Sequence, residues 1–98
     1  MEMLRQGDVY FIRKEQAPQG IVQEKRDSKG RAIFALGEVT GHAHAVETKT
    51  GEIFTNPADN SRWYIATEAT EVVHEEHGII TLPAESVWEV VIQRRLSL

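Results

Sequence analysis

The chain has 98 residues, of which 41% are hydrophobic and 27% charged, as in an ordinary soluble globular domain. This length predicts a single domain over residues 1–98, because chains usually divide into domains only well beyond this size. The absence of cysteine excludes disulfide scaffolds, thiol nucleophiles and Cys-ligated zinc or iron–sulfur sites. A formal net charge of −4 argues against a nucleic-acid partner bound by bulk electrostatics.

The apolar runs are far shorter than the ~20 residues that a membrane-spanning helix needs. The N-terminal residues also lack the apolar stretch of a signal peptide. We therefore expect a cytoplasmic protein with no membrane partner.

In chain order, the sequence predicts short strands separated by turns. Residues 9–12 are β-formers, and a type I turn at 27–30 is expected to join strands 21–25 and 32–36 as a hairpin. Further strands are expected at 41–47, 52–54, 63–67, 71–74, 79–82 and 87–92, with a second hairpin turn at 49–51. No stretch keeps a helical period over three turns. The pattern predicts an all-β domain, a small antiparallel barrel or sandwich.

The four histidines fall in two short clusters. His42 and His44 are two residues apart, so on a strand their side chains share one face and their ring nitrogens can converge on one cation. His74 and His77 are three apart, which brings them together only on a turn, and Gly78 favours a turn there. Either both of these histidines join the first pair, or only one does.

This arrangement predicts a divalent metal site built from three or four imidazoles. Imidazole ligands suit Zn, Mn, Fe(II), Ni or Cu, and the sequence does not choose among them. Four nearby carboxylates could add a ligand, support a ligand or act as a general base: Glu38, Glu47, Glu75 and Glu76.

Two other interpretations of the histidines stay open. Paired imidazoles titrate near neutrality and could act as general acid and base in phosphodiester cleavage without a metal. Alternatively, the histidines could be structural or form a contact surface. His74 and His77 do not have the four-residue helical spacing of the zinc protease signature, and no phosphate-binding loop or nucleophile elbow is present.

Residues 37–46, GEVTGHAHAV, and 74–83, HEEHGIITLP, resemble a family of small uncharacterised proteins from bacteria, prophages and phages. Its members are similar in opening with the motif at residues 5–9, RQGDV, and in ending near Gln93 and Arg94, so the likeness covers most of the chain. Many members have a second Pro or Gly after Leu-Pro, where this chain has residues 84–86, AES. The resemblance implies no activity.

Gly37, His42, His44 and Glu47 also resemble the first motif of cupin barrels, although the gaps around the histidines are shorter. The Pro-X-Gly that precedes the second cupin histidine is missing. This resemblance implies a metal inside a small barrel, held by His42, His44 and one of His74 or His77.

The leading hypothesis from the sequence is a metal-dependent hydrolase of a small phosphorylated or nucleotide-like substrate. In this hypothesis His42, His44 and His77 bind the metal, with or without His74, and Glu75 or Glu76 is the base. The competing hypothesis is a non-enzymatic phage or prophage accessory protein that acts on a host protein partner. Exposed sheet edges favour a homodimer in either case.

Overall fold

The computed structural model describes residues 2–37 and 41–93. Within these ranges it contains ten strands and no helix, so none of the described residues forms a helix able to cross a membrane. The strands are β1 (Met3–Gln6), β2 (Val9–Lys14), β3 (Val22–Gln23), β4 (Ala32–Leu36), β5 (Ala43–Val46), β6 (Gly51–Thr55), β7 (Arg62–Ala66), β8 (Thr70–Val72), β9 (Ile80–Leu82) and β10 (Ser86–Ile92). The all-β prediction is confirmed.

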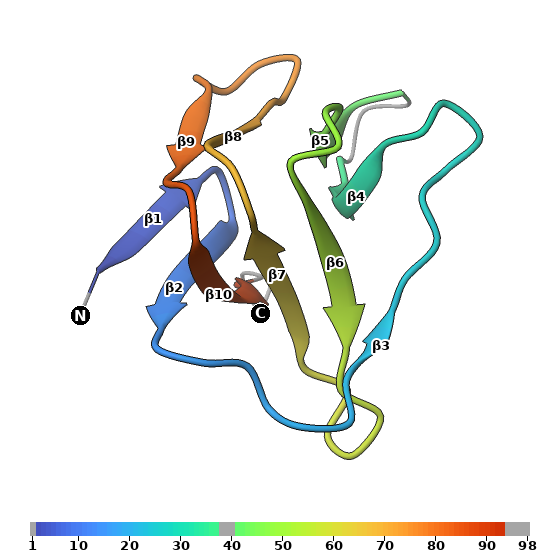
Figure 1. Cartoon of the computed structure of the whole chain (residues 1–98). Helices are drawn as coiled ribbons and strands as arrows, with labels where there is room; N and C mark the ends of the chain where they lie inside the picture. The colour runs from blue at the N-terminus through green and yellow to red at the C-terminus, as the bar shows by residue number, and fades with distance from the viewer. Residues whose placement is uncertain (1, 38–40, 94–98) are drawn as a thin grey trace, which may run out of the picture.

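Six strands form one antiparallel sheet in the order β1-β2-β10-β7-β6-β3 (Figure 1). In the described ranges this order ends at β1 and β3, and each of them pairs with one neighbour. Strand β10 lies inside this sheet and alternates in burial, with Trp88 and Val90 buried and Val87 and Glu89 partly exposed.

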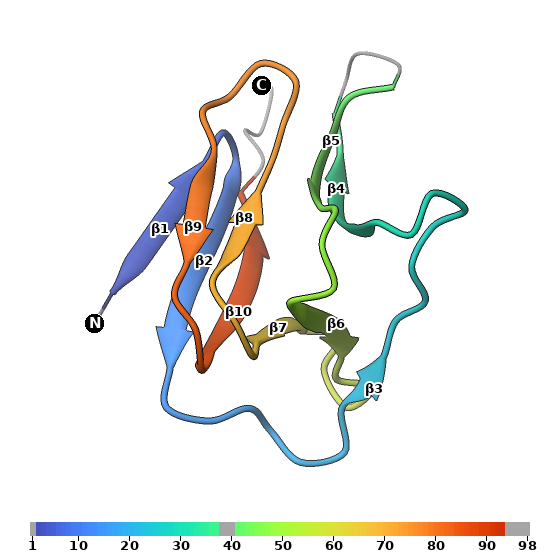
Figure 2. The same ribbon diagram turned by 45° about the horizontal axis from the view of Figure 1, so that its top comes forward.

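The remaining strands form two antiparallel pairs, β4–β5 and β8–β9. A bridge between Ala45 and Val73 joins them, with backbone N–H···O distances of 3.0 and 2.8 Å. Both pairs lie at the same end of the molecule in Figure 1, and β9 lies close to β1 in both views (Figures 1 and 2).

The hydrophobic core lies between these pairs and the large sheet, because it draws buried side chains from both. Phe34 of β4 packs edge-to-face against Phe11 of β2 and Tyr64 of β7, at ring centroid distances of 5.0 and 5.4 Å. Val72 of β8 and Leu82 of β9 are fully buried in the same cluster. The core therefore fixes where the two strand pairs, and the loops that they carry, stand on the sheet.

The predicted hairpin between 21–25 and 32–36 is wrong, although its turn forms. Gly30 donates its backbone N–H to the Asp27 carbonyl at 2.9 Å, but β3 pairs with β6 and β4 pairs with β5. Arg26 gives a physical reason, since its guanidinium donates to the carbonyls of Gly30 and Gly51 and to Glu52. These bonds hold the chain where it crosses from the large sheet to the β4–β5 pair.

The turn at 49–51 likewise connects two sheets, because β5 and β6 do not pair with each other. The strand β1 was not predicted from the sequence.

Candidate metal centre

The fold brings the two histidine clusters together. His44 lies in β5 and is buried, and His42 immediately precedes that strand. His74 and His77 lie in the loop between β8 and β9, which we call the histidine loop (residues 74–78). The bridge between Ala45 and Val73 places the start of this loop beside β5. This pairing accounts for the meeting of clusters that lie 30 residues apart in the chain, counted from His44 to His74.

His74 is the centre of the cluster. Its ring centroid lies 4.3 Å from that of His44, 4.6 Å from that of His77 and 5.7 Å from that of His42. His44 and His77 are nearly parallel, at 5.7 Å and 16°. The rings of His42, His44 and His77 thus all lie near the ring of His74.

Two overlapping groups of side chains offer potential ligand atoms that all lie within 4.8 Å of one another. One group is His44, His74 and His77, and the other is His42, His74 and Glu75. His74 belongs to both groups, but neither group contains all four histidines. A single ion therefore cannot use every predicted ligand in this geometry.

His44 is held in one tautomer by its hydrogen bond to Gln6. Its Nδ1 is 2.8 Å from Oε1 of the buried Gln6, while the amide nitrogen of Gln6 donates to the carbonyls of Val72 and Gly78 at 2.9 and 3.0 Å. Carbonyls only accept, so Gln6 presents its oxygen to the ring, and Nδ1 of His44 must be the donor. The lone pair of neutral His44 is therefore on Nε2.

Burial is the main cause that lowers the pKa of His44, and the neighbouring His74 acts in the same direction. Asp8 and Glu75 oppose this shift without reversing it. The neutral form, which is the one that binds metals, is thus favoured. Asp8 Oδ1 lies 3.6 Å from His44 Nε2, on the side of the free lone pair.

His74 has the opposite arrangement of its two ring nitrogens. Its Nδ1 accepts the backbone N–H groups of Glu76 at 3.0 Å and His77 at 3.3 Å, which closes the turn of the histidine loop. A neutral His74 therefore carries its proton on Nε2. The His74 ring both shapes the loop and faces the other imidazoles.

The carboxylates predicted from the sequence differ in their surroundings. Glu75 Oε1 accepts the backbone N–H of Ala43 at 2.9 Å, and this bond is the first cause of the lowered pKa of Glu75. Glu76 Oε1 lies 3.5 Å from His42 Nδ1. Glu47 is exposed and belongs to neither ligand group, whereas Glu38 lies outside the described residues.

Sequence reasoning missed the contribution of the β1–β2 turn. Gln6 orients His44, and Asp8 lies beside it. Gly7 lies against the imidazole rings, because a Cβ atom added to Gly7 would be 2.7 Å from His77 Nε2 and 3.2 Å from His44 Cε1. All three residues lie in the motif at residues 5–9, which indicated a family resemblance and no site.

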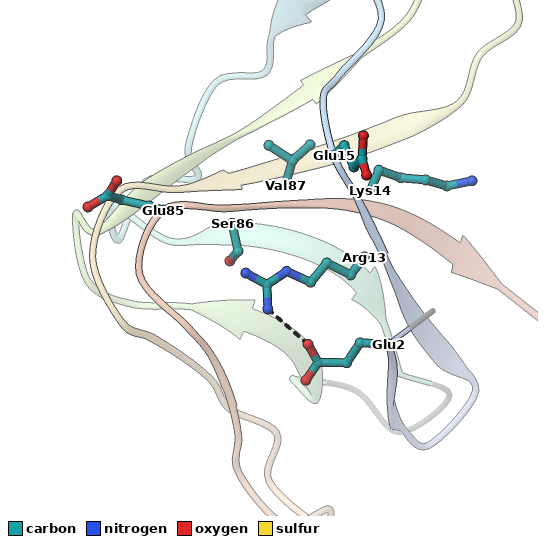
Figure 3. Close-up of a pocket in the computed structure, with 7 residues that line it drawn as sticks. All are labelled: Glu2, Arg13, Lys14, Glu15, Glu85, Ser86 and Val87. Atoms are coloured by element: carbon teal, nitrogen blue, oxygen red, sulfur yellow. Dashed lines mark hydrogen bonds and ion pairs between the residues drawn. The ribbon is translucent and has the colours of Figure 1, made fainter.

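An open pocket of about 420 Å³ lies elsewhere and has no histidine in its lining (Figure 3). Its lining residues are Glu2, Arg13, Lys14, Glu15, Glu85, Ser86 and Val87. Arg13 pairs with Glu2 at 3.0 Å, and the Ser86 hydroxyl donates to the Pro83 carbonyl. Arg13, Glu2 and Ser86 thus already have partners within the protein, and the histidine cluster is the stronger candidate site.

A family model described as "Domain of unknown function (DUF8820)" matches residues 5–93. The chain belongs to this family. The match covers the β1–β2 turn, both histidine clusters and β10, so the whole candidate site lies inside the family domain. No curated protein and no solved structure matches the chain. The function of this family member must therefore be argued from the site itself.

Proposed function

We propose that the protein binds one divalent metal ion through His44, His74 and His77. The proximity of these three imidazoles carries the proposal, since their potential ligand atoms lie within 4.8 Å of one another. The tautomer of His44 supports it, because Nδ1 donates to Gln6 and the lone pair on Nε2 is left for a ligand bond. Metal-bound histidines commonly donate their second ring N–H to an acceptor in this way.

The donor set fits a catalytic type of site better than a closed structural one. Three protein ligands with a further position for water are typical of catalytic zinc, and imidazole also suits Fe(II), Mn and Ni. His77 is exposed and His74 is half-buried, so solvent can reach the cluster. His42 lies beside His74 but belongs to the other group, with Glu75, so it is not one of the three ligands proposed.

The reaction proposed is hydrolysis of a small phosphorylated or nucleotide-like substrate. A divalent metal at this site would supply an activated water and polarise a substrate oxygen. Glu75 and Glu76 remain candidate bases, and Asp8 joins them because its carboxylate lies 3.6 Å from His44 Nε2. Asp8 is mostly exposed, so solvent can reach its carboxylate.

The first experiment is elemental analysis of untagged protein purified without chelators, together with zinc titration. His77→Ala is the main variant, because removing an exposed ring leaves the core intact. Glu47→Ala is the matched control, since that exposed side chain lies outside both ligand groups. We expect near-stoichiometric metal in the wild type and the control, and loss of metal in His77→Ala. A wild-type protein that binds no added Zn, Mn, Fe or Ni would refute the proposal.

One observation favours a second candidate, metal-independent acid–base catalysis. His44 presents a lone pair on Nε2 and neutral His74 presents a proton on Nε2, with the two ring centroids 4.3 Å apart. Such a pair could take and return a proton during phosphodiester cleavage. Cleavage of a model phosphodiester that persists in EDTA and disappears in His44→Ala would support this candidate over the metal site.

Several finer predictions have no observation of their own in the structure. These are the phage or prophage origin, the cupin likeness, the cytoplasmic location, the host protein partner and the homodimer. They stay predictions, and the family match carries only the coarser statement that the domain is of unknown function.

A further inference from the structure

Gln6 contacts the histidine site at several points, and no sequence pattern indicated this. It is the last residue of β1 and only 2% exposed. Its side-chain amide makes three hydrogen bonds, to the ring of His44 and to the carbonyls of Val72 and Gly78. Val72 ends β8 just before the histidine loop, and Gly78 ends that loop. One buried amide therefore contacts β5 and both ends of the loop.

The orientation of this amide follows from its partners alone. The two backbone carbonyls require the two N–H donors of the amide nitrogen, so the amide oxygen is left for His44. If the amide were reversed, its oxygen would face two carbonyl oxygens, and the nitrogen would face the ring. Both carbonyls would then lose this donor, and for Val72, whose bond to Gln6 is buried, the loss costs about 1–3 kcal/mol.

We propose that Gln6 is a positioning residue that sets the tautomer of His44 and holds the histidine loop closed. Through the first bond it keeps the proton of His44 on Nδ1 and the lone pair on Nε2. Through the other two bonds it fixes the distance between the start and the end of the segment that carries His74 and His77. This inference deepens the proposed function, on which its consequence for metal affinity rests.

The two roles of Gln6 can be separated by two substitutions of similar size. Gln6→Glu keeps an oxygen that accepts from His44 Nδ1 but loses the donors to Val72 and Gly78. Gln6→Met loses both the acceptor and the donors. A purely structural role predicts that both variants lose metal affinity in proportion to their loss of stability. A tautomer-setting role predicts that Gln6→Glu keeps more affinity than its stability indicates.

The test is NMR of ¹⁵N-labelled histidine rings in the metal-free protein, followed by zinc titration of the same samples. In the wild type we expect a protonated Nδ1 and a bare Nε2 on His44. In Gln6→Met we expect this pattern to be lost and the zinc affinity to fall 10–100-fold, the usual range for partners that orient ligands. In Gln6→Glu we expect the protonated Nδ1 to persist, with an affinity closer to wild type. Gln23→Met, at an exposed glutamine on β3, is the control.

The result for wild-type His44 decides the inference even if a variant fails to fold. A proton on Nε2 in the metal-free wild type would overturn it, whatever the metal result. Unchanged zinc affinity in a folded Gln6→Met would overturn the positioning role. A wild type with protonated Nδ1 that binds no metal would refute the proposed function and leave the assignment to Gln6 in place.

Discussion

Substitution of Gly7 by alanine tests whether the β1–β2 turn is part of the site. Gly7 has a φ of 58°, in the left-handed region that alanine adopts with strain. A Cβ atom at this position would lie 2.7 Å from His77 Nε2. The substitution therefore adds backbone strain and pushes an imidazole out of place.

The size of both effects can be worked out from the structure. The backbone strain costs about 1–2 kcal/mol. The His77 ring must retreat from 2.7 Å to at least 3.4 Å, an ordinary contact distance, which is a movement of about 0.7 Å. Because His77 is exposed, the ring can move without disturbing the core. Metal sites tolerate only about 0.2 Å in ligand distance, so we expect zinc affinity to fall at least ~10-fold.

Gly30→Ala is the matched control, because Gly30 has a φ of 79° and no heavy atom within 4 Å of its added Cβ. Thermal unfolding should show a similar loss for both variants, about 4–8 °C for each kcal/mol in a domain of this size. Zinc competition titration should show lower affinity only for Gly7→Ala. Equal zinc affinity in the two variants would refute the placement of His77 in the site.

Three further predictions concern the scaffold. Arg62→Met should destabilise the fold by about 1–3 kcal/mol in urea unfolding. The Arg62 guanidinium donates to Glu24 and to the carbonyls of Ile33 and Phe34, and these bonds connect β7 to β4. The ammonium of Lys14 lies 3.7 Å from Glu89 in a partly exposed ion pair, so Lys14→Met should change stability by less than ~1 kcal/mol. Equal losses of stability in Arg62→Met and Lys14→Met would contradict this reasoning. Burial raises the pKa of Glu24, but bonds from Arg62 and Thr55 outweigh it, so the folded pKa is below the usual 4.5. A lowered pKa stabilises the fold above pH 4.5, and that stability is lost as the pH falls through the pKa of the folded state. Glu24→Gln should therefore flatten the acid side of a profile of stability against pH. An unchanged profile would exclude Glu24 as a cause of acid destabilisation. Phe34→Ala should cost about 3–5 kcal/mol by urea unfolding, since Phe34 is buried between Phe11 and Tyr64, and a loss below ~1 kcal/mol would mean that β4 does not pack on the sheet.

The sequence was sufficient to predict the all-β class and most strands, because alternation and turn residues are local signals. It also predicted that His42 and His44 lie on one side and that His74 and His77 share a turn. It left open whether His74 and His77 both join the first pair. In the structure His42 precedes β5, and the rings of His42, His44 and His77 lie near that of His74. What it could not predict is which strands pair. The turn at 27–30 forms as expected, but the partners of β3 and β4 are set by Arg26 and by core packing, which are long-range contacts.

The residues that orient the site were harder to predict for the same reason. Gln6 is 38 residues from His44 and 72 from Gly78, and nothing local marks a glutamine as buried. Asp8 reads as an ordinary turn residue, and Gly7 as an ordinary turn glycine. Their roles appear only when the histidine loop lies over the β1–β2 turn.

The two candidate functions make opposite demands on one proton of His74. If Nε2 of His74 binds a metal, the remaining proton must be on Nδ1, and the N–H groups of Glu76 and His77 lose their acceptor. Two lost hydrogen bonds cost about 1 kcal/mol each, far less than zinc binding on the order of 10 kcal/mol can supply. Acid–base catalysis instead keeps Nδ1 as an acceptor and both bonds in place. Zinc should therefore accelerate amide hydrogen exchange at Glu76 and His77 while the rest of the loop becomes more ordered. Zinc that binds with full protection of both amides would mean that His74 coordinates through another geometry or does not coordinate at all.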